Sequence, residues 1–166
     1  MTRLAITLAT AWLAVAALDA HAAPTRLFEN RFGQVEVPVT PRCIVSLHDF
    51  SLTTQLLELG HTPCGSSGRK RLFEAPVFRG ATGHFDTTSI RYIGSHQAPD
   101  IETIAALEPD LIVGLSYHAN LRETLSRIAP VVLMPAREAG IQANAAELAA
   151  LTGTQTRYQA MLDEYR

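Results

Sequence analysis

The sequence predicts an α/β fold, in which a parallel, Rossmann-like sheet is flanked by helices. Short runs of residues that are apolar on both faces recur along the chain, a pattern typical of parallel strands buried between two layers of helices. A helix-forming segment follows most of these runs, often opened by proline–aspartate or closed by glycine. The chain has 166 residues, of which 47% are apolar and 18% charged, so it is long enough to bury one core.

The N-terminus is expected to be a secretory signal peptide over residues 1–22. Arg3 supplies a positive start, residues 4–18 form an uncharged apolar run, and Ala20-His21-Ala22 is a small-x-small cleavage site. The apolar run is shorter than the roughly 20 residues of a membrane-spanning helix. No cysteine follows it closely, which argues against a lipid anchor. Cleavage after Ala22 would release a soluble protein into the periplasm.

The expected elements follow one another in the order that a parallel sheet requires. A β-hairpin over residues 25–38, with its turn at 30–33, leads the fold. Strands are then expected at 43–47, 62–66, 92–94, 111–114 and 131–134, and helices at 50–59, 101–107, 120–128 and 141–151. Gly60 is the expected C-cap of the first helix and Asp100 the N-cap of the second. We expect residues 23–153 to form one lobe.

The last segment of the chain, residues 154–166, is expected to begin another helix. Thr154 is a suitable cap. The apolar side chains then recur at helical spacing on one face, at Tyr158, Met161, Leu162 and Tyr165.

Candidate binding residues lie in the loops that follow the expected strands, because ligands of open α/β sheets bind at the carboxyl ends of the strands. Tyr117 is the strongest candidate, since a phenol offers an apolar face and one hydrogen-bonding group. Arg137 follows the last strand, and its guanidinium is suited to pair with an anionic oxygen such as that of a carboxylate. The other candidates are Ser116, His118, His96, His48 and Arg69. For each, the competing interpretation is a solvated surface side chain.

The spacing of the histidines and cysteines bears on whether the protein has a metal site or a disulfide. The histidines have no metal-ligand spacing such as HxxxH or HExxH, so we expect no protein metal site and no cofactor. Cys43 and Cys64 belong to neighbouring expected strands. An oxidising compartment permits a disulfide between them, whereas two buried free thiols are equally consistent with the sequence.

Charge and motif content exclude or weaken two other classes of function. The net charge is −2, which is no footprint of a nucleic-acid-binding protein. An exported α/β hydrolase would need a nucleophile and a base, and Ser116-Tyr117-His118 is the one suggestive cluster. The segment 114–118 lacks the closing glycine of a G-x-S-x-G elbow. We therefore expect a binding protein rather than an enzyme. We also expect the protein to be a monomer.

Four segments resemble, in order and spacing, the periplasmic iron–siderophore and vitamin B12 binding proteins of ABC importers. They are residues 33–47, 56–65, 93–112 and 127–132, and the most specific is Pro99-Asp100-Ile101-Glu102 through Pro109-Asp110-Leu111-Ile112. The resemblance implies the N-terminal lobe of a two-lobed protein, ending inside the long helix that joins the lobes. It is closest to ferric dicitrate and hydroxamate binders, and a cobalamin or haem binder on the same fold is the alternative.

The resemblance also implies roles for two residues. In the family, a glutamate at the position of Glu102 meets the membrane permease, which receives the iron(III) chelate. Many siderophore binders carry an arginine where this chain has His96. Arginine is always charged and bidentate, and histidine is neither. Either the ligand carries less negative charge, or another cation, such as Arg69 or Arg137, binds the anionic chelate in place of that arginine. One lobe offers half a pocket, so this chain alone is expected to bind its chelate poorly.

Overall fold

The structure, a computed structural model, describes residues 23–70, 85–136 and 140–164. Its centre is a parallel sheet of five strands in the order β5-β4-β3-β8-β9. The strands are β3 (Ile44–Ser46), β4 (Gly65–Ser66), β5 (Arg91–Tyr92), β8 (Leu111–Leu115) and β9 (Val131–Met134). The predicted α/β class with a parallel sheet is therefore confirmed.

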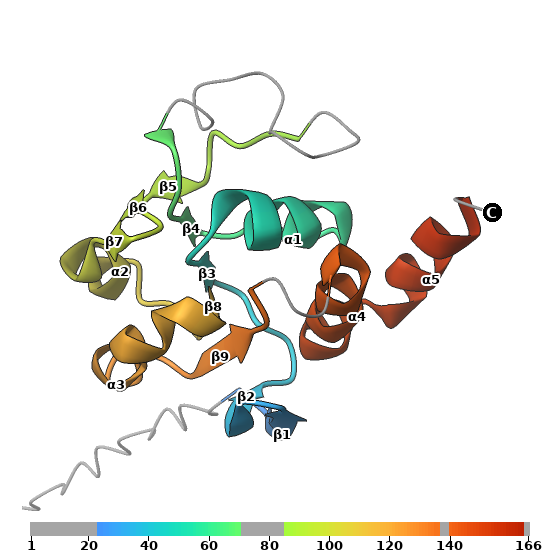
Figure 1. The fold of residues 1–166 in the computed structure, drawn as a ribbon, viewed down its shortest axis with the longest axis horizontal. Helices are drawn as coiled ribbons and strands as arrows, with labels where there is room; N and C mark the ends of the chain where they lie inside the picture. Colours follow the sequence, from blue (N-terminus) through green and yellow to red (C-terminus); the bar gives the residue numbers. More distant parts are fainter. Residues whose placement is uncertain (1–22, 71–84, 137–139, 165–166) are drawn as a thin grey trace, which may run out of the picture.

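Alternate residues of the central strands pack into two separate apolar cores, one on each face of the sheet. Val113 of β8 belongs to the first core and its neighbour Ile112 to the second, as the period of two along a strand requires. The first core is completed by α1 (Thr54–Glu58), α4 (Gly140–Thr152) and the hairpin, and the second by α2 (Ile101–Ala106) and α3 (Arg122–Leu125). Figure 1 shows these helices around the sheet.

The leading hairpin forms as predicted, from β1 (Thr25–Asn30) and β2 (Gly33–Pro38) in antiparallel register. Its Phe28 and Val37 enter the first core. Arg26 donates hydrogen bonds from its guanidinium to the carbonyl oxygens of Ala150 and Leu151, at 2.6 and 2.9 Å. These carbonyls lie in the last turn of α4, where backbone acceptors have no partner within the helix, so the hairpin caps that helix.

The helix after β3 begins with a π-helical segment, η1 (Asp49–Thr53), and continues as α1. The expected range of 50–59 differs from the observed one by a single residue at each end, and the π-helical start was not predicted. Gly60 closes the helix with a φ of 89°, as a left-handed C-cap does. The expected N-cap of α2 is also present, because the carboxylate of Asp100 accepts hydrogen bonds from the backbone N–H groups of Glu102 and Thr103.

Three segments differ from the sequence-based expectation. The strand expected at 62–66 is shortened to β4. The strand expected at 92–94 is split into β5 and β6 (Gly94–Ser95), and β6 pairs with β7 (Ala98–Pro99) in a small antiparallel ribbon. The helix expected at 120–128 begins earlier, as the 3₁₀ segment η3 (Ser116–Leu121) before α3. Short turns of this kind are set by local hydrogen bonds that apolar periodicity does not report.

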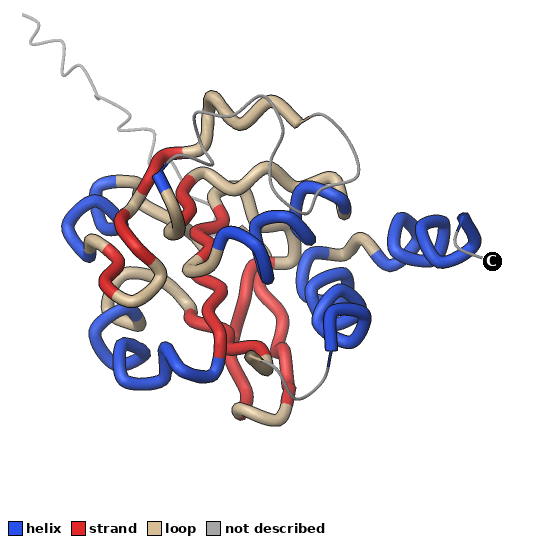
Figure 2. Tube along the Cα trace, turned by 45° about the horizontal axis from the view of Figure 1, so that its top comes forward, coloured by secondary structure: helices blue, strands red, loops and turns tan. Residues whose placement is uncertain are grey.

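The final helix, α5 (Gln155–Glu164), projects away from the body of the fold in both Figure 1 and Figure 2. None of its described residues is fully buried, although Tyr158 and Met161 pack partly against the first core. Two hydrogen bonds hold its first turns: Arg157 donates to the carbonyl of Glu58, and the Tyr158 hydroxyl donates to the carbonyl of Gln142. Within the described ranges, no helix has the length and apolarity to cross a membrane.

A disulfide joins Cys43 and Cys64, with Cα atoms 5.2 Å apart. Of the two alternatives that the sequence left open, the structure thus contains the bonded form. The bridge links the entrances of β3 and β4, at the amino ends of these two neighbouring strands. It therefore lies at the end of the sheet where the strands begin, opposite to the loops that follow the strands.

Candidate functional site

The candidate site lies where the chain changes direction across the sheet. From β3 the chain adds β4 and β5 on one side, and it then returns to place β8 and β9 on the other side. The loops after β3 and β8 therefore diverge at their carboxyl ends, and such switch points form the ligand crevices of open α/β sheets. His48 follows β3, and Ser116, Tyr117 and His118 follow β8.

His48 is fixed as the N-cap of the helix that starts at Asp49. Its Nδ1 accepts a 3.0 Å hydrogen bond from the backbone N–H of Ser51. A neutral imidazole that accepts at Nδ1 carries its proton at Nε2, so Nε2–H is the donor that His48 presents. Burial lowers the pKa of His48, an effect that the nearby Asp49 carboxylate partly offsets. The side chain is 17% exposed.

A chain of buried hydroxyl groups supports the backbone of His48. The Thr53 hydroxyl donates to Ser46 Oγ at 2.8 Å, and Ser46 Oγ in turn donates to the carbonyl oxygen of His48 at 3.1 Å. The Thr53 hydroxyl also lies 2.6 Å from Ser66 Oγ, a hydrogen bond in which either hydroxyl can be the donor. All three side chains are fully buried. Ordered networks of this kind rigidify the groups that they reach.

Asp49 is a buried carboxylate that joins the first helix to the loop after β4. Its Oδ1 accepts from the backbone N–H of Phe50 at 2.8 Å, and its Oδ2 from that of Arg69 at 3.2 Å. Gly68 packs directly against it, because a Cβ on Gly68 would lie 2.5 Å from the Cβ of Asp49. Gly68 also has a φ of 154°. Asp49 is thus engaged by backbone groups, and it holds the loop that carries Arg69.

His118 lies beneath the site rather than at its surface. It is 2% exposed, and its ring lies against Gly114, where an added Cβ would be 3.3 Å from Nδ1. Nδ1 accepts from the backbone N–H of Leu115 at 2.9 Å, so Nε2 carries the proton and donates to the carbonyl oxygen of His96 at 2.8 Å. Burial lowers the pKa of His118. Both ring nitrogens are therefore used to position backbone.

The rings of three predicted residues meet above His118. The centroid of His48 lies 5.2 Å from that of His96 and 6.4 Å from that of Tyr117. His96 comes from the turn between β6 and β7, where Gly94 has a φ of 91° and a Cβ would lie 2.7 Å from the carbonyl of Ala98. Tyr117 is 48% exposed. Three strand-end loops thus contribute one aromatic ring each to a common surface.

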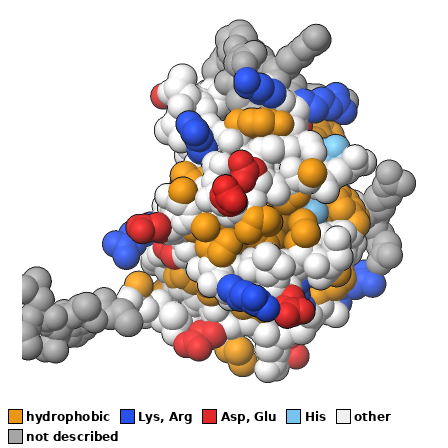
Figure 3. Space-filling model, turned by 90° about the vertical axis from the view of Figure 1, so that its left-hand side faces the viewer, with side chains coloured by type: hydrophobic (Ala, Val, Ile, Leu, Met, Phe, Trp, Pro, Cys, Tyr) orange, Lys and Arg blue, Asp and Glu red, His pale blue; other side chains and the backbone are white. Residues whose placement is uncertain are grey.

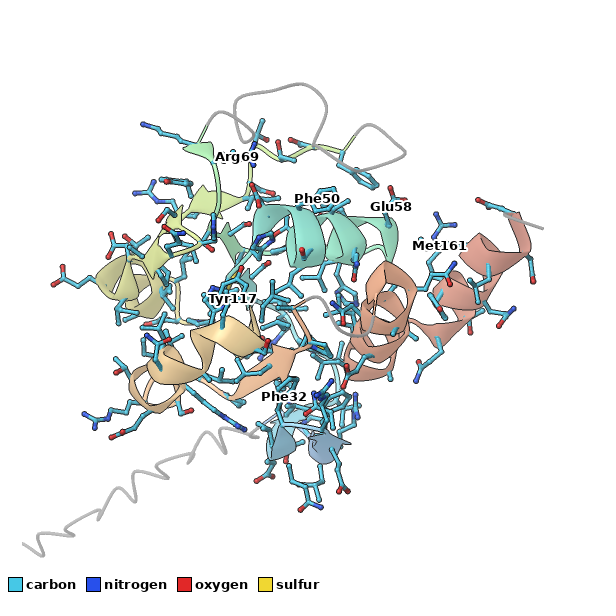
Figure 4. All side chains as sticks on the ribbon, viewed as in Figure 1. Phe32, Phe50, Glu58, Arg69, Tyr117 and Met161 are labelled. Atoms are coloured by element: carbon cyan, nitrogen blue, oxygen red, sulfur yellow. A yellow bond between two sulfur atoms is a disulfide. The ribbon has the colours of Figure 1, made fainter. Side chains whose placement is uncertain are left out.

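The remaining predicted residues are less closely gathered. Arg69 is exposed, and Figure 4 shows it apart from Tyr117, by the loop after β4. Ser116 is half-buried at the start of η3, and Arg137 lies outside the described residues. Glu102 is exposed in the first turn of α2. Across the described ranges, no group of three or more histidine, cysteine, aspartate or glutamate side chains is placed to hold a metal ion.

Sequence reasoning missed the supports of the site: the hydroxyl chain, Asp49 and the use of His118 as a scaffold. One signal was present for His118, because Gly114 stands four residues before it and leaves room for its ring. The hydroxyl chain had no comparable signal, since Ser46, Thr53 and Ser66 come from three separate elements.

A parallel α/β lobe whose strand-end loops bring aromatic side chains together at the switch point is an architecture that ligand-binding proteins use. Residues 78–166 match the family model described as periplasmic binding protein. The match covers more than half of the chain, and this protein belongs to the periplasmic binding protein family, whose members are binding proteins.

Individual relatives agree with this assignment. The Fe(3+)-citrate-binding protein YfmC of Bacillus subtilis is 30% identical over 116 residues, which are 69% of this chain and 35% of that protein. The Fe(3+) dicitrate-binding periplasmic protein FecB of Escherichia coli is 36% identical over 78 residues, covering 45% of this chain and 26% of that protein. The chain thus spans between about a quarter and about a third of the length of these curated relatives.

A solved structure shares both the fold and part of the sequence. The siderophore-binding protein FhuD from Vibrio cholerae, bound to Fe3+ and Desferal, superposes with a TM-score of 0.62 at 31% identity. The superposition covers 74% of this chain and 46% of that one.

Proposed function

We propose that the protein is the substrate-binding component of an ABC importer, which captures an iron(III) chelate of the siderophore or citrate type and delivers it to a permease. The observation that carries the proposal is the aromatic surface of His48, His96 and Tyr117 at the switch point of the sheet. Such rings suit a chelate rim, because each offers an apolar face and a hydrogen-bonding group. The named ligands of YfmC, FecB and FhuD support the same class.

The proposal includes export to the periplasm with cleavage after Ala22, and action as a monomer without a cofactor of its own. It also includes the absence of catalysis. Ser116 would need a general base, and the neighbouring His118 spends both ring nitrogens on the backbone of Leu115 and His96. A base must have a free lone pair within reach of the proton that it abstracts, so His118 does not fill this role.

We place the docking surface for the permease at Glu102, on the side of the molecule formed by α2 and α3. Glu102 is exposed, and its carboxylate is not needed to cap α2, since Asp100 does so. Figure 3 looks onto this side and shows acidic side chains next to an apolar area. An exposed acidic group suits a basic partner, because charge complementarity steers association.

A titration with four ligands tests the proposed function. The native chain would be followed by NMR, which detects weak binding, while ferric citrate, a ferric hydroxamate, haem or cobalamin is added. The proposal expects saturable changes in the NMR signals with one of the two iron(III) chelates and none with cobalamin or haem. With paramagnetic iron(III), these changes are broadening of signals near the site as well as shifts. Binding of cobalamin or haem alone would show that the ligand is not an iron(III) chelate of the siderophore or citrate type. Binding of none of the four ligands would refute the proposal. Tyr117→Ala should weaken chelate binding about tenfold, within the range for a central aromatic contact.

A further inference from the structure

His48 and His96 are both partly exposed and in contact at the proposed site. They differ in whether the imidazole can take up a second proton without losing a hydrogen bond. A second proton on His48 would have to sit on Nδ1, which already accepts the backbone N–H of Ser51. Two donors would then face each other across 3.0 Å, and the N-cap of the helix would be lost. His48 is therefore held as a neutral ring that donates from Nε2.

His96 is under no such restriction. Its backbone carbonyl is bound by His118, but within the described part of the chain its side chain makes no hydrogen bond, so its ring can accept a proton without breaking one. Among the described residues, the ionisable groups that interact with the pair are Tyr117, His118, Arg69 and Asp49. Asp49 lies on the His48 side of the pair, with its Oδ1 3.6 Å from His48 Nδ1, and its two oxygens accept hydrogen bonds from the backbone N–H groups of Phe50 and Arg69.

We infer that the proposed site takes a carboxylate-bearing, anionic iron(III) chelate and binds about one proton together with it, at the side chain of His96. This inference rests on the proposed function. An anion against the two rings receives a hydrogen bond from His48 Nε2–H and an ionic one from His96, which becomes an imidazolium. Two adjacent imidazoles repel each other when both are charged. Because the hydrogen bond from Ser51 keeps His48 neutral, this repulsion does not arise. His96 supplies the positive charge in the bound state, because a nearby negative charge favours the protonated form of an imidazole.

Calorimetric titration with ferric citrate tests the inference. The heat of binding is measured at pH 7 in several buffers of different ionisation enthalpy, and its slope gives the number of protons taken up. Citrate exchanges protons of its own, so each variant is compared with the native chain under identical conditions. By linkage, the native chain should take up about one proton more than His96→Gln. His48→Gln should bind more weakly but keep the native proton count, and His61→Gln, at the other edge of the sheet, should match the native chain.

His96→Arg provides a second measurement, because arginine keeps its charge at every pH used. The native affinity for ferric citrate should fall by up to about tenfold per pH unit relative to His96→Arg as the pH rises from 7 to 9. Equal proton counts in the native chain and His96→Gln, or equal pH slopes in the native chain and His96→Arg, would overturn the inference while leaving chelate binding intact. Binding of an uncharged ferric hydroxamate in preference to ferric citrate would overturn it as well. Absence of all binding would overturn both the inference and the proposed function.

Discussion

His118 Nε2–H donates a 2.8 Å hydrogen bond to the backbone carbonyl of His96. The buried His118 thereby fixes the turn that carries the partly exposed His96. This hydrogen bond joins the loop after β8 to the loop after β5. Tyr117, whose ring centroid lies 4.3 Å from that of His118, is seated on the same ring. Two of the three rings of the proposed binding surface, His96 and Tyr117, therefore depend on a residue that offers no nitrogen to a ligand.

Replacing His118 by phenylalanine tests this dependence. The substitution keeps a ring in place but leaves the buried N–H of Leu115 without its acceptor, which should cost about 2 kcal/mol in the free energy of unfolding. Affinity for ferric citrate should fall as well, because the turn carrying His96 loses its anchor. Urea unfolding and a ligand titration measure the two effects. His61→Phe is the control, and a His118→Phe chain with native stability and native affinity would show that the anchor is unimportant.

The stability of the protein should depend on pH below neutrality. Burial lowers the pKa of both His48 and His118 from the ordinary value of 6.5. As the pH falls below 6.5, the unfolded chain therefore binds protons that the folded chain does not, and stability is lost. The loss should reach up to about 1.4 kcal/mol per pH unit for each histidine, whereas stability above pH 7 should not vary from this cause.

Urea midpoints at pH 7.5, 6.5 and 5.5 measure this loss. Burial raises the pKa of Glu147, and a raised carboxyl pKa favours the folded state as the pH falls, which acts in the opposite direction. The native chain should therefore be compared with His118→Gln, whose midpoint should change less over the same range. Parallel pH dependences in the two chains would contradict the assignment to His118.

The disulfide between Cys43 and Cys64 should contribute about 3 kcal/mol to stability, since it closes a loop of moderate length in the unfolded chain. Replacing both cysteines by serine should lower the urea midpoint correspondingly. The reducing agent dithiothreitol should lower the midpoint of the native chain and leave that of the double variant unchanged. If the native midpoint does not respond to reduction, the bond is either not formed or not stabilising.

Docking at Glu102 predicts that binding and delivery can be separated. In cells with the complete importer, Glu102→Arg should reduce iron uptake several-fold, because it places a positive charge against a basic partner. The affinity of the purified chain for the chelate should stay native, since Glu102 lies outside the proposed site. Glu29→Arg, on the exposed hairpin, is the matched control. A lower chelate affinity in Glu102→Arg would assign this residue to the ligand instead.

The fold was largely predictable from the sequence, and the site only in part. Runs such as Leu111–Leu115 and Val131–Met134 are apolar on both faces, and this property alone identifies buried parallel strands. The π-helical start at Asp49 and the ribbon of β6 and β7 were not predictable, because they are set by local hydrogen bonds that apolar periodicity does not report. Sequence position alone also marked His118 and His48 as equal candidates, whereas their tertiary contacts give them different roles.

The most direct test of the account is to map where the chelate contacts the chain. Gallium(III) citrate, a diamagnetic stand-in for the iron(III) complex, would be added to the isotopically labelled native protein and followed by NMR. The account predicts that the largest shift changes fall on His48, His96 and Tyr117, with little change at His61. Changes centred elsewhere, for example on the groove beside Arg122 and Pro130, would contradict a binding site at the switch point of the sheet.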